Sequence, residues 1–256
     1  MKRTALITGA SSGIGADLAR LFARDGYDLV LVARSEEKMR ELAKELGVPA
    51  TILAVDLSKP EAVRQIVDQL VAKSINIDVL VNNAGLGVAG PFVTTDLAKE
   101  LEMIQVNIVA LTELTKLLLP AMVSRKSGRI LNIASTASFQ PGPLMAVYYA
   151  SKAYVLSFSE AIADELRDSG VTVTALCPGP TATGFVSAAG VKETRLFTLM
   201  KPMSSMDVAK KGYEAMQRGK RVAVAGMMNR LLVESVRVSP RRVVTTIVRK
   251  LQESRL

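Results

Sequence analysis

The fold of this chain can be inferred from a stretch near its N-terminus, Thr8-Gly9-Ala10-Ser11-Ser12-Gly13-Ile14-Gly15. The apolar run Thr4–Thr8 leads into it, and Ile14–Arg24, whose apolar residues recur at helical spacing, follows it. The three glycines allow a tight turn and let a phosphate approach backbone N–H groups where the helix begins. A strand, a glycine-rich turn and a helix in this order predict a dinucleotide-binding unit, and the alternative is a tight turn without a ligand.

The same alternation of short and long patterns continues along the chain. Short runs rich in Val, Ile and Leu are typical of strands in a parallel sheet that is buried on both faces, and the longer segments between them have helical spacing. The pattern predicts one Rossmann-like α/β domain over residues 1–256, with a doubly wound parallel sheet and helices on both faces. Strands are expected at Thr4–Thr8, Asp28–Ala33, Thr51–Val55, Asp78–Val81, Ile130–Ile133, Val171–Leu176 and near Arg221–Val224. Helices are expected at Ile14–Arg24, Ser35–Leu46, Ser58–Ala72 (opened by the capping box Ser58-Lys59-Pro60-Glu61), Leu97–Val123, Tyr148–Arg167 and Met206–Arg218.

Three residue counts exclude whole classes of chemistry. The 256 residues include no His, no Trp and one Cys. Without His, Ser-His-Asp catalysis and His-ligated zinc or iron sites are excluded, and one Cys cannot form an intrachain disulfide or a multi-Cys metal site. General acid–base chemistry must therefore come from Tyr, Lys, Asp or Glu, and no metal is expected.

We expect a cytoplasmic protein. The single Cys suits a reducing compartment, and no apolar run approaches the roughly 18 residues of a membrane-spanning helix. The basic start Met1-Lys2-Arg3 is similar to that of a signal peptide, but the apolar stretch after it ends at Thr8-Gly9 and is too short.

Cofactor choice depends on the end of the second strand, Val32-Ala33-Arg34. Chains that use NAD usually place an acidic residue here for the ribose hydroxyls, whereas an Arg suits the 2′-phosphate of NADP. Ala33 occupies the acidic position and Arg34 follows it, which favours NADP(H) over NAD(H). Glu36 and Glu37 argue against this preference, and a solvated surface charge is the alternative for Arg34.

Polar residues also follow the third and fourth strands. Asp56, which precedes Leu57, could accept a hydrogen bond from the adenine amino group, or could simply form a turn. The stretch Asn82-Asn83-Ala84-Gly85 offers small residues for close approach of a cofactor and amides that can tie strands together. A structural Asx turn is the alternative there.

Tyr148 and Lys152 form a candidate acid–base pair. Their spacing of four residues at the start of a helix places both side chains on one face. An ammonium group beside a phenol favours the phenolate and lowers the tyrosine pKa from about 10. The alternative is an exposed pair that stabilises the helix. Tyr149 is a weaker candidate, because Ala153 lies four residues after it.

Ser135 and Asn107 are two further polar candidates. Ser135 follows the fifth strand, at the edge where open α/β sheets bind ligands. Solvation in a loop is its alternative, and Ser138 is a rival donor. Asn107 lies within a predicted helix, where Asn is unfavourable, and either a buried hydrogen-bonding role or plain surface exposure would account for it.

Together these motifs resemble those of the short-chain dehydrogenase/reductase family, over essentially the whole chain. They occur in the family's order and at its spacing, and the step of 13 residues from Ser135 to Tyr148 favours these two residues over Ser138 and Tyr149. The matching elements are Thr8–Gly15, Asp56-Leu57, Asn82–Gly85, Asn107, Ser135, Tyr148 with Lys152, and Pro178-Gly179-x-x-x-Thr183.

The resemblance implies a role for each of these residues. Tyr148 would exchange a proton with the carbonyl or alcohol oxygen, and Lys152 would bind the nicotinamide ribose and lower the tyrosine pKa. Ser135 would hydrogen-bond the carbonyl, and Asn107 would hold a helix irregularity and a water leading to Lys152. The cofactor carries the hydride. Besides Tyr148 and Lys152, the residues implied to contact it are Gly9, Ser11, Ser12, Gly13, Ile14, Gly15, Arg34, Asp56, Leu57, Asn83, Ala84, Gly85, Pro178, Gly179, Thr181 and Thr183.

Residues 183–204 occupy the position of the family's substrate lid. Their apolar side chains, with those that follow Ser135 and Gly85, predict a hydrophobic substrate. The alternative is packing against the protein's own core, and Lys192 and Arg195 could either meet an acidic group or be solvated. The apolar candidates are Phe185, Val186, Val191, Leu196, Phe197, Leu199, Met200 and Met203 in the lid, Phe139, Pro141, Pro143, Leu144 and Met145 after Ser135, and residues 88–93.

Residues 226–256 form a basic segment that we expect to be helical. Residues 210–256 hold 12 Lys and Arg against 3 Glu, which accounts for the whole net charge of +9. Ser239 can cap a helix whose first residue is Pro240. Such a helix packs on its own body, pairs subunits or lies on an anionic membrane surface. Nucleic-acid binding is not expected, because no aromatic platform accompanies the charge. The apolar stripe of this helix comprises Val243, Val244, Ile247, Val248 and Leu251.

We therefore predict an NADP(H)-dependent oxidoreductase that interconverts a carbonyl and a secondary alcohol of a small molecule, as a homodimer or homotetramer. Two rivals are a dinucleotide-binding scaffold or sensor with little turnover, and a membrane-surface or partner-binding protein that uses the basic C-terminal helix. A third is a dehydratase or epimerase on the same fold. Replacing Tyr148 with Phe separates the enzyme from the scaffold, because an enzyme would lose turnover and keep its cofactor, whereas a scaffold would keep its function.

Overall fold

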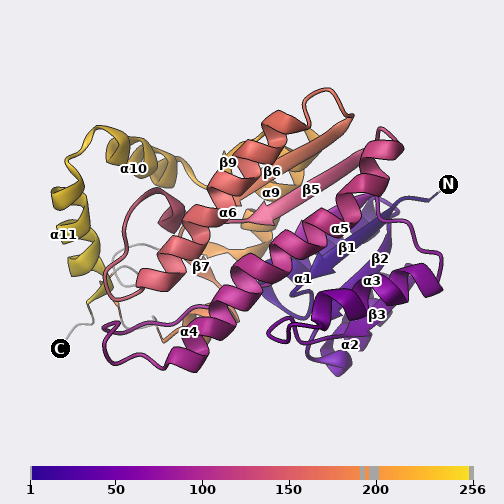
Figure 1. The fold of residues 1–256 in the computed structure, drawn as a ribbon, viewed down its shortest axis with the longest axis horizontal. Helices are drawn as coiled ribbons and strands as arrows, with labels where there is room; N and C mark the ends of the chain where they lie inside the picture. The colour runs from indigo at the N-terminus through magenta and orange to yellow at the C-terminus, as the bar shows by residue number, and fades with distance from the viewer. Residues whose placement is uncertain (1, 191–193, 196–201, 254–256) are drawn as a thin grey trace.

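Seven parallel strands form one central sheet (Figure 1). The computed structural model describes residues 2–190, 194–195 and 202–253. The strand order is β3-β2-β1-β4-β5-β6-β9, so the chain builds outward on one side of β1 before β4 adds on the other. The strands are β1 (Thr4–Thr8), β2 (Asp28–Ala33), β3 (Ala50–Ala54), β4 (Val79–Asn82), β5 (Gly128–Ile133), β6 (Val171–Cys177) and β9 (Val222–Val224).

The direction of strand addition reverses between β1 and β4. Leu6 of β1 is level with Val30 of β2 on one side and with Leu80 of β4 on the other. The connections that follow β1 and β4 therefore diverge, which opens a crevice at the carboxyl ends of these strands. The seven predicted strands and the doubly wound Rossmann-like fold are confirmed, although β3 lies one residue earlier than predicted, β4 lies one residue later and β5 begins two residues earlier.

Helices cover both faces of the sheet. Successive strand residues point to opposite faces, so Ile7 packs in one core with α1, α2 and α9, whereas Leu6 packs in the other with α3, α5 and α6. Figure 1 shows α5 and α6 side by side in front of the sheet. These helices are α1 (Gly13–Arg24), α2 (Glu36–Leu46), α3 (Ala62–Ala72), α5 (Leu111–Ser124), α6 (Ala146–Glu165) and α9 (Ser205–Gln217).

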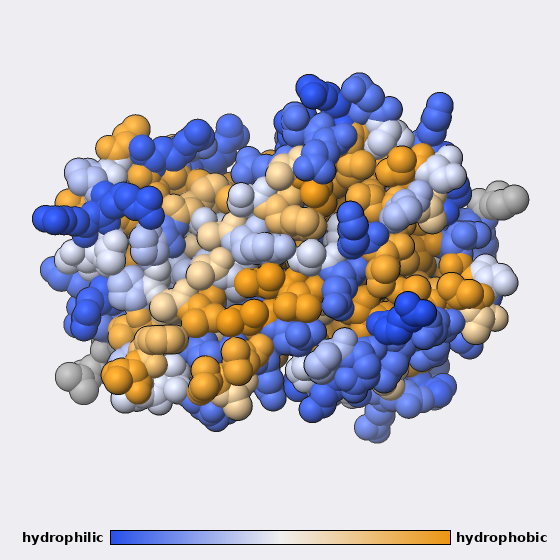
Figure 2. All heavy atoms as spheres, in the orientation of Figure 1, coloured by the Kyte–Doolittle hydropathy of each residue, from blue (hydrophilic) through white to orange (hydrophobic). Residues whose placement is uncertain are grey.

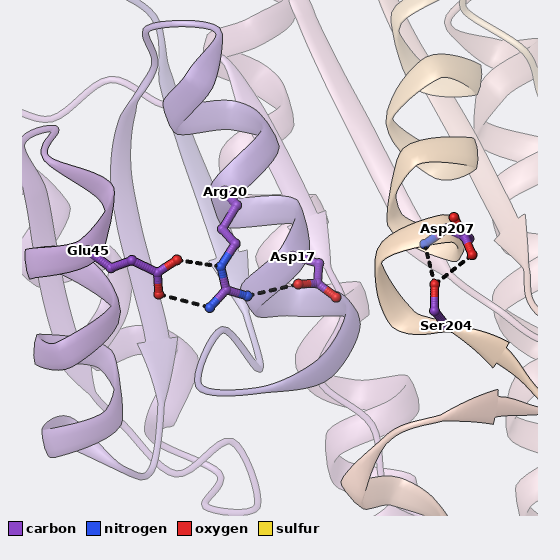
Figure 3. A network of polar contacts seen from close by, with 5 residues as sticks. All are labelled: Asp17, Arg20, Glu45, Ser204 and Asp207. Carbon is purple, nitrogen blue, oxygen red and sulfur yellow. Dashed lines mark hydrogen bonds and ion pairs between the residues drawn. The ribbon is translucent and has the colours of Figure 1, made fainter.

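Arg20 ties α1 to α2, as Figure 3 shows. Its Nε lies 2.7 Å from Glu45 Oε1, and its Nη1 lies 2.8 Å from Asp17 Oδ1. The hydrogen bond with Glu45 is the main reason that the pKa of Arg20 lies above the ordinary value of an arginine. In the same figure, Ser204 Oγ accepts a hydrogen bond from Asp207 N at 3.0 Å and thereby caps α9.

The predicted start of α3 at Ser58 is wrong. The helix begins at Ala62, with Glu61 at its N-cap position, and residues 57–61 form turns. Ser58 N donates to Asp56 Oδ1 at 3.0 Å. The Asp56 side chain thus closes a turn over the residues that the capping pattern had assigned to the helix.

The long helix predicted at Leu97–Val123 has an irregular middle. It consists of α4 (Leu97–Ile104), a π-helical segment η1 (Gln105–Ala110), and α5. Contrary to the expectation from the sequence, the stretch Leu97–Ser124 is long and apolar enough to cross a membrane, by length and composition. A core helix passes the same test, and one face of this helix packs in the second core through Val106, Leu114 and Met122.

Two helices end the described chain, α10 (Met227–Val238) and α11 (Arg241–Gln252). They project at the end of the molecule opposite the N-terminus (Figure 1). Ser239 does not cap α11 as predicted: its Oγ donates to Ser235 O at 2.7 Å and so closes α10, while Pro240 takes the N-cap position. The apolar stripe of α11 is divided, because Val244 and Val248 are buried whereas Val243 and Ile247 are about half exposed.

The substrate-lid segment is described only in part. It contains β7 (Thr181–Ala182), α7 (Gly184–Ala188) and β8 (Met203–Ser204). β7 pairs with β8 through Thr181 and Met203. The predicted lid residues Val191, Lys192, Leu196, Phe197, Leu199 and Met200 lie outside the described residues.

Candidate active site

One cleft of about 580 Å³ runs along the carboxyl ends of the strands. It brings together residues that the sequence places far apart, from the glycine turn near the N-terminus to Gln252 in the last turn of α11. Almost all the predicted site residues line it. They are Gly9, Ser11, Ser12, Gly13, Ile14, Arg34, Asp56, Leu57, Asn83, Ala84, Gly85, Ser135, Tyr148, Lys152, Pro178, Gly179, Thr181 and Thr183.

Gly15 and Asn107 are the two predicted site residues that do not line this cleft. A Cβ on Gly15 would lie 2.3 Å from Gly9 O, so this glycine lets α1 pack against the end of β1. Its place in the structure is therefore a packing position beneath the turn. Asn107 is considered below with the residues that it positions.

The turn before α1 can accommodate a dinucleotide. Gly9 and Gly13 have φ values of +64° and +55°, which suit glycine far better than other residues. Ser12, the N-cap residue of α1, lines the cleft and makes no side-chain hydrogen bond to cap the helix, so its side chain leaves the N–H groups of the first turn available to a ligand. Thr183 closes over this turn, with its methyl carbon 3.1 Å from where a Cβ on Gly13 would lie. A pyrophosphate fits such a cradle.

The two amides that follow β4 have different structural tasks. Asn82 is buried, and its Nδ2 donates to Asn132 Oδ1 at 2.8 Å and to Thr115 Oγ1 at 3.1 Å. Asn83 Nδ2 donates to Thr8 O at 2.9 Å and to Gly9 O at 3.2 Å. Both amides thus tie neighbouring strands together, and Asn83 also fixes the glycine turn.

Two cations lie where β2 ends. Arg34 and Lys38 are exposed and line the cleft beside Ser35, the N-cap residue of α2. No hydrogen bond or ion pair with a described residue holds Arg34. Of the two acidic residues that argued against an NADP preference, Glu36 is paired with Arg40 one turn along α2, and Glu37 is exposed and is not among the residues that line the cleft. Sequence reasoning missed Lys38, although its position three residues after the helix N-cap could have indicated it.

Tyr148, Lys152 and Ser135 lie together deep in the cleft. Lys152 is 5% exposed, and its Nζ lies 5.9 Å from the centre of the Tyr148 ring. That ammonium group donates to Ile133 O at 2.8 Å. Ser135 Oγ accepts a hydrogen bond from Ala137 N at 3.1 Å, and the Ser135 side chain acts on the pKa of Tyr148. The phenol of Tyr148, the hydroxyl of Ser135 and the amine of Lys152 therefore lie close together in the cleft.

Burial acts on both titratable groups of this cluster. It raises the pKa of Tyr148 to about 12, although the Ser135 side chain opposes this rise. It lowers the pKa of Lys152 to about 8. Lys152, which the sequence predicted to lower the tyrosine pKa, is not among the described groups that shift it, and burial is the largest cause of the shift.

Asn107 holds the loop after β4 against α6. Its Oδ1 accepts from Leu86 N at 2.8 Å, and its Nδ2 donates to Leu86 O at 3.0 Å and to Ser151 Oγ at 3.0 Å. Ser151 Oγ in turn donates to Tyr148 O at 2.7 Å. Asn107 is fully buried in the π-helical segment, so of the two explanations for an Asn within this helix, the buried hydrogen-bonding one is confirmed.

The two rival residues have different places. Ser138 is buried and donates to Lys152 O at 2.7 Å, outside the cleft. Tyr149, in contrast, lines the cleft, and its hydroxyl oxygen accepts a hydrogen bond from Gln252 Nε2 at 2.6 Å. Gln252 was not foreseen, since no local pattern connects residues 103 positions apart.

The fold and this cleft define a class of protein: a doubly wound α/β domain with a dinucleotide-binding turn and a Ser, Tyr and Lys cluster in one crevice. A model of the short chain dehydrogenase family matches residues 3–194. The chain therefore belongs to the short-chain dehydrogenase/reductase family, as the motifs suggested, and it is an oxidoreductase that acts on CH–OH or C=O groups.

Known relatives agree with this assignment. A ketoacyl reductase of Nostoc is 35% identical over 206 residues, which cover 79% of this chain and 72% of that protein. A short chain dehydrogenase of Pseudocercospora fijiensis is 38% identical over 182 residues, and these span 69% of this chain but only 59% of that relative. The structure of a short-chain dehydrogenase from Sphingobium yanoikuyae in complex with NADPH has 33% identity and a TM-score of 0.83, with 98% of each chain covered.

Proposed function

We propose that this protein is an NADP(H)-dependent reductase that converts a carbonyl group to a secondary alcohol, with Tyr148 as its general acid. One observation carries the proposal: a single cleft contains both the glycine turn and the Ser135, Tyr148 and Lys152 cluster. The turn, Asp56 and Thr183 would hold the cofactor. When bound, NADPH supplies the hydride.

The cluster can polarise a carbonyl and deliver a proton. The Ser135 and Tyr148 hydroxyls both line the cleft and can donate to one carbonyl oxygen. The Tyr148 phenol keeps its proton at neutral pH, so it is present in the protonated form that can donate to the alcohol oxygen formed by reduction. Lys152 Nζ donates one of its three N–H groups to Ile133 O, so two remain for the cofactor ribose.

The cofactor preference is supported by charge. Arg34 and Lys38 are two exposed cations beside the turn at Ser35, and Glu36 is engaged elsewhere. Two cations favour the 2′-phosphate that distinguishes NADP from NAD. The relative from Sphingobium yanoikuyae was also solved with NADPH. Titrating the protein into NADPH and NADH, with nicotinamide fluorescence as the signal, tests the preference directly.

The substrate end of the cleft is mainly apolar, which supports a hydrophobic substrate. Leu86, Met145, Phe185 and Ala188 line it, and the Phe185 ring is 5.4 Å from that of Tyr148. Part of the predicted lid packing is also present, because Phe185 and Val186 contact the cluster that contains Met145. Both explanations of the apolar lid thus have support among the described residues.

Substitution of Tyr148 by Phe tests the proposal. The variant keeps the ring and loses the proton, so we expect reduction of ketones by NADPH to fall roughly 100- to 10,000-fold, as for other general acids. NADPH binding should persist, since the ring still lines the cleft. Full turnover in the variant would remove Tyr148 from the mechanism. Product formed without any loss of NADPH absorbance would favour a dehydratase or epimerase.

We also propose a homo-oligomer, in the cytoplasm as expected from the sequence. Figure 2 shows hydrophobic side chains gathered over the part of the front face where Figure 1 places α4 and α5. Leu97, Leu101 and Leu117 are each about half exposed or more. A membrane-surface role for the basic C-terminal helix has less support, because Val244 and Val248 of α11 pack against this same chain.

A further inference from the structure

The last turn of α11 forms part of the wall of the active-site cleft. Gln252, its final residue, is only 6% exposed and lines the same cleft as Tyr148. Val244 and Val248 fix the helix by packing with Met145 and Tyr149. The next residue, Glu253, accepts a hydrogen bond from Arg195 N at 3.2 Å. Although α11 is distant in sequence from the other active-site residues, it places the side-chain amide of Gln252 at the end of the cleft where the substrate would bind.

Only one end of the Gln252 amide is used within the described structure. Its Nε2 donates to the Tyr149 hydroxyl oxygen at 2.6 Å. Its Oε1 is buried and has no hydrogen-bond partner among the described residues. A buried acceptor without a partner is costly, and such groups are uncommon in folded proteins. Gln252 thus brings to the cleft wall a buried acceptor that has no partner among the described residues.

Tyr149 holds this amide in a defined position. It is 6% exposed, and its ring lies over Gly142, where a Cβ would be 2.1 Å from the ring carbon Cγ. The ring also packs edge-on to Tyr148, with 6.0 Å between the ring centres. The group that orients Gln252 is thus fixed relative to the proposed proton donor.

We propose that Gln252, positioned by Tyr149, is a specificity-determining residue whose Oε1 accepts a hydrogen bond from a hydroxyl group on the substrate, remote from the carbonyl that reacts. The inference rests on the proposed reductase function and narrows its substrate class. The substrate is an otherwise apolar ketone that carries a second, neutral oxygen function. Met145 and Phe185 would contact its carbon skeleton.

The charges around the cleft favour a hydroxyl over an ionised group. Among the described residues that line the cleft, the charged ones are Arg34, Lys38, Asp56 and Lys152. The first three follow β2 and β3, and Lys152 adjoins Tyr148. None of these four adjoins Gln252, and the neighbouring Glu253 and Arg195 are not among the described residues that line the cleft. Burying an unpaired charge is far more costly than burying a hydroxyl that finds an acceptor.

Matched ketone pairs test the proposal. The probes are 2-alkanones of five to nine carbons, each with and without a terminal hydroxyl, and the readout is kcat/KM for NADPH-dependent reduction. At the chain length that reaches Gln252, we expect the wild type to favour the hydroxylated member by roughly 5- to 150-fold, the range for a satisfied against an unsatisfied buried acceptor. In Gln252→Met, which keeps the length of the side chain and loses the amide, this ratio should fall to near 1.

Three further variants separate recognition from packing. Val248→Ala loosens the contact of α11 with the cleft wall but keeps the amide, so the hydroxyl preference should remain. Tyr149→Phe removes the acceptor for Nε2, so the preference should shrink because the amide can turn. Gln69→Leu, an exposed change on α3, should leave it unaltered. Equal kcat/KM for both members at every chain length, or a preference that survives in Gln252→Met, would overturn the proposal.

A binding measurement keeps this inference distinct from the proposed function. The Tyr148→Phe protein with NADPH is titrated with the same pairs, and each dissociation constant is read from nicotinamide fluorescence. Tighter binding of the hydroxylated member, lost when Gln252→Met is added, supports the role of Gln252 even if Tyr148 proves not to be the acid. Equal binding, or binding of neither member, rejects the role of Gln252 even if ketone reduction is established.

Discussion

Tyr148 and Lys152 lie one helical turn apart, yet burial moves their pKa values in opposite directions. Burial disfavours the charged form of each group, so the phenol pKa rises to about 12 and the ammonium pKa falls to about 8. The phenol consequently holds its proton at neutral pH. Lys152 is the group that changes charge near physiological pH, and it is charged below its pKa and neutral above it.

This difference predicts the pH dependence of ketone reduction. We expect kcat/KM for NADPH, which reports groups of the free enzyme, to be level below pH 8 and to fall above it as Lys152 loses its proton. An arginine stays charged at any accessible pH. In Lys152→Arg the break near pH 8 should therefore disappear, whatever the absolute rate. A break that persists in this variant would assign it to another group.

Arg34 and Lys38 carry the prediction on cofactor choice. Replacing both with Ala removes two cations from the cleft, and we expect NADPH to bind roughly 10- to 100-fold more weakly while NADH binding changes little, because only NADPH has the 2′-phosphate. Fluorescence titrations measure both affinities. Lys44→Ala, an exposed change farther along α2, is the matched control. Equal weakening for the two cofactors would contradict the assignment.

The sequence predicts local patterns far better than contacts between distant segments. Tyr148 and Lys152 were found from a spacing of four residues, and Arg34 from its place after a strand. Tyr149 was set aside because no lysine follows it at that spacing. Its partner is Gln252, which lies 103 residues away, and only the packed position of α11 brings the two together.

At the scale of elements, the π-helical segment η1 is the feature that most affects the site. Asn107 within it satisfies the backbone N–H and C=O groups of Leu86 and reaches Ser151 under Tyr148. Asn107 was recognised from the sequence as unfavourable in an α-helix. The π-helical segment around it was not predicted, because the spacing of apolar residues does not distinguish a π-helical turn from an α-helical one. The starts of α3 and α11 were predicted too early for a similar reason. Asp56 and Ser239 form hydrogen bonds within the preceding turns, so neither predicted N-cap forms.

Asn107→Ala tests what this segment contributes. The change leaves two partly buried backbone groups of Leu86 without their Asn107 partner, so we expect unfolding to require about 1–3 kcal/mol less free energy. Ketone reduction should fall as well, because the loop at Leu86 and the first turns of α6 lose their common anchor. Urea unfolding and kcat measure the two effects, with Lys99→Ala on the exposed side of α4 as the control. A variant with unchanged stability would show that the anchor is dispensable.

At the scale of the whole molecule, the sheet order brings the predicted site residues, apart from Gly15 and Asn107, to one cleft at the carboxyl ends of the strands. Because β1 and β4 are neighbours, the glycine turn and the Asn83 loop meet, and β5 and β6 bring Ser135 and Pro178 alongside. The right-handed connections that produce this order follow from general rules, which is why alternation of patterns alone was enough to predict the fold. Those rules do not predict which surface of the domain another subunit would cover.

The apolar face of α4 and α5 leads to a prediction about assembly. Leu101 is 56% exposed and Leu117 is 47% exposed, and contiguous apolar surface of this kind on a soluble protein marks an interface. We expect light scattering after gel filtration to give a dimer or tetramer for the wild type and a monomer for Leu101→Glu with Leu117→Glu, because two buried carboxylates on each side would face each other unpaired. Val71→Glu, which places a carboxylate on an apolar residue of α3 that is 73% exposed, should not change the mass. If the double variant keeps the wild-type mass, subunits associate through another surface, and the exposed apolar residues of α10 and α11 become the next candidates.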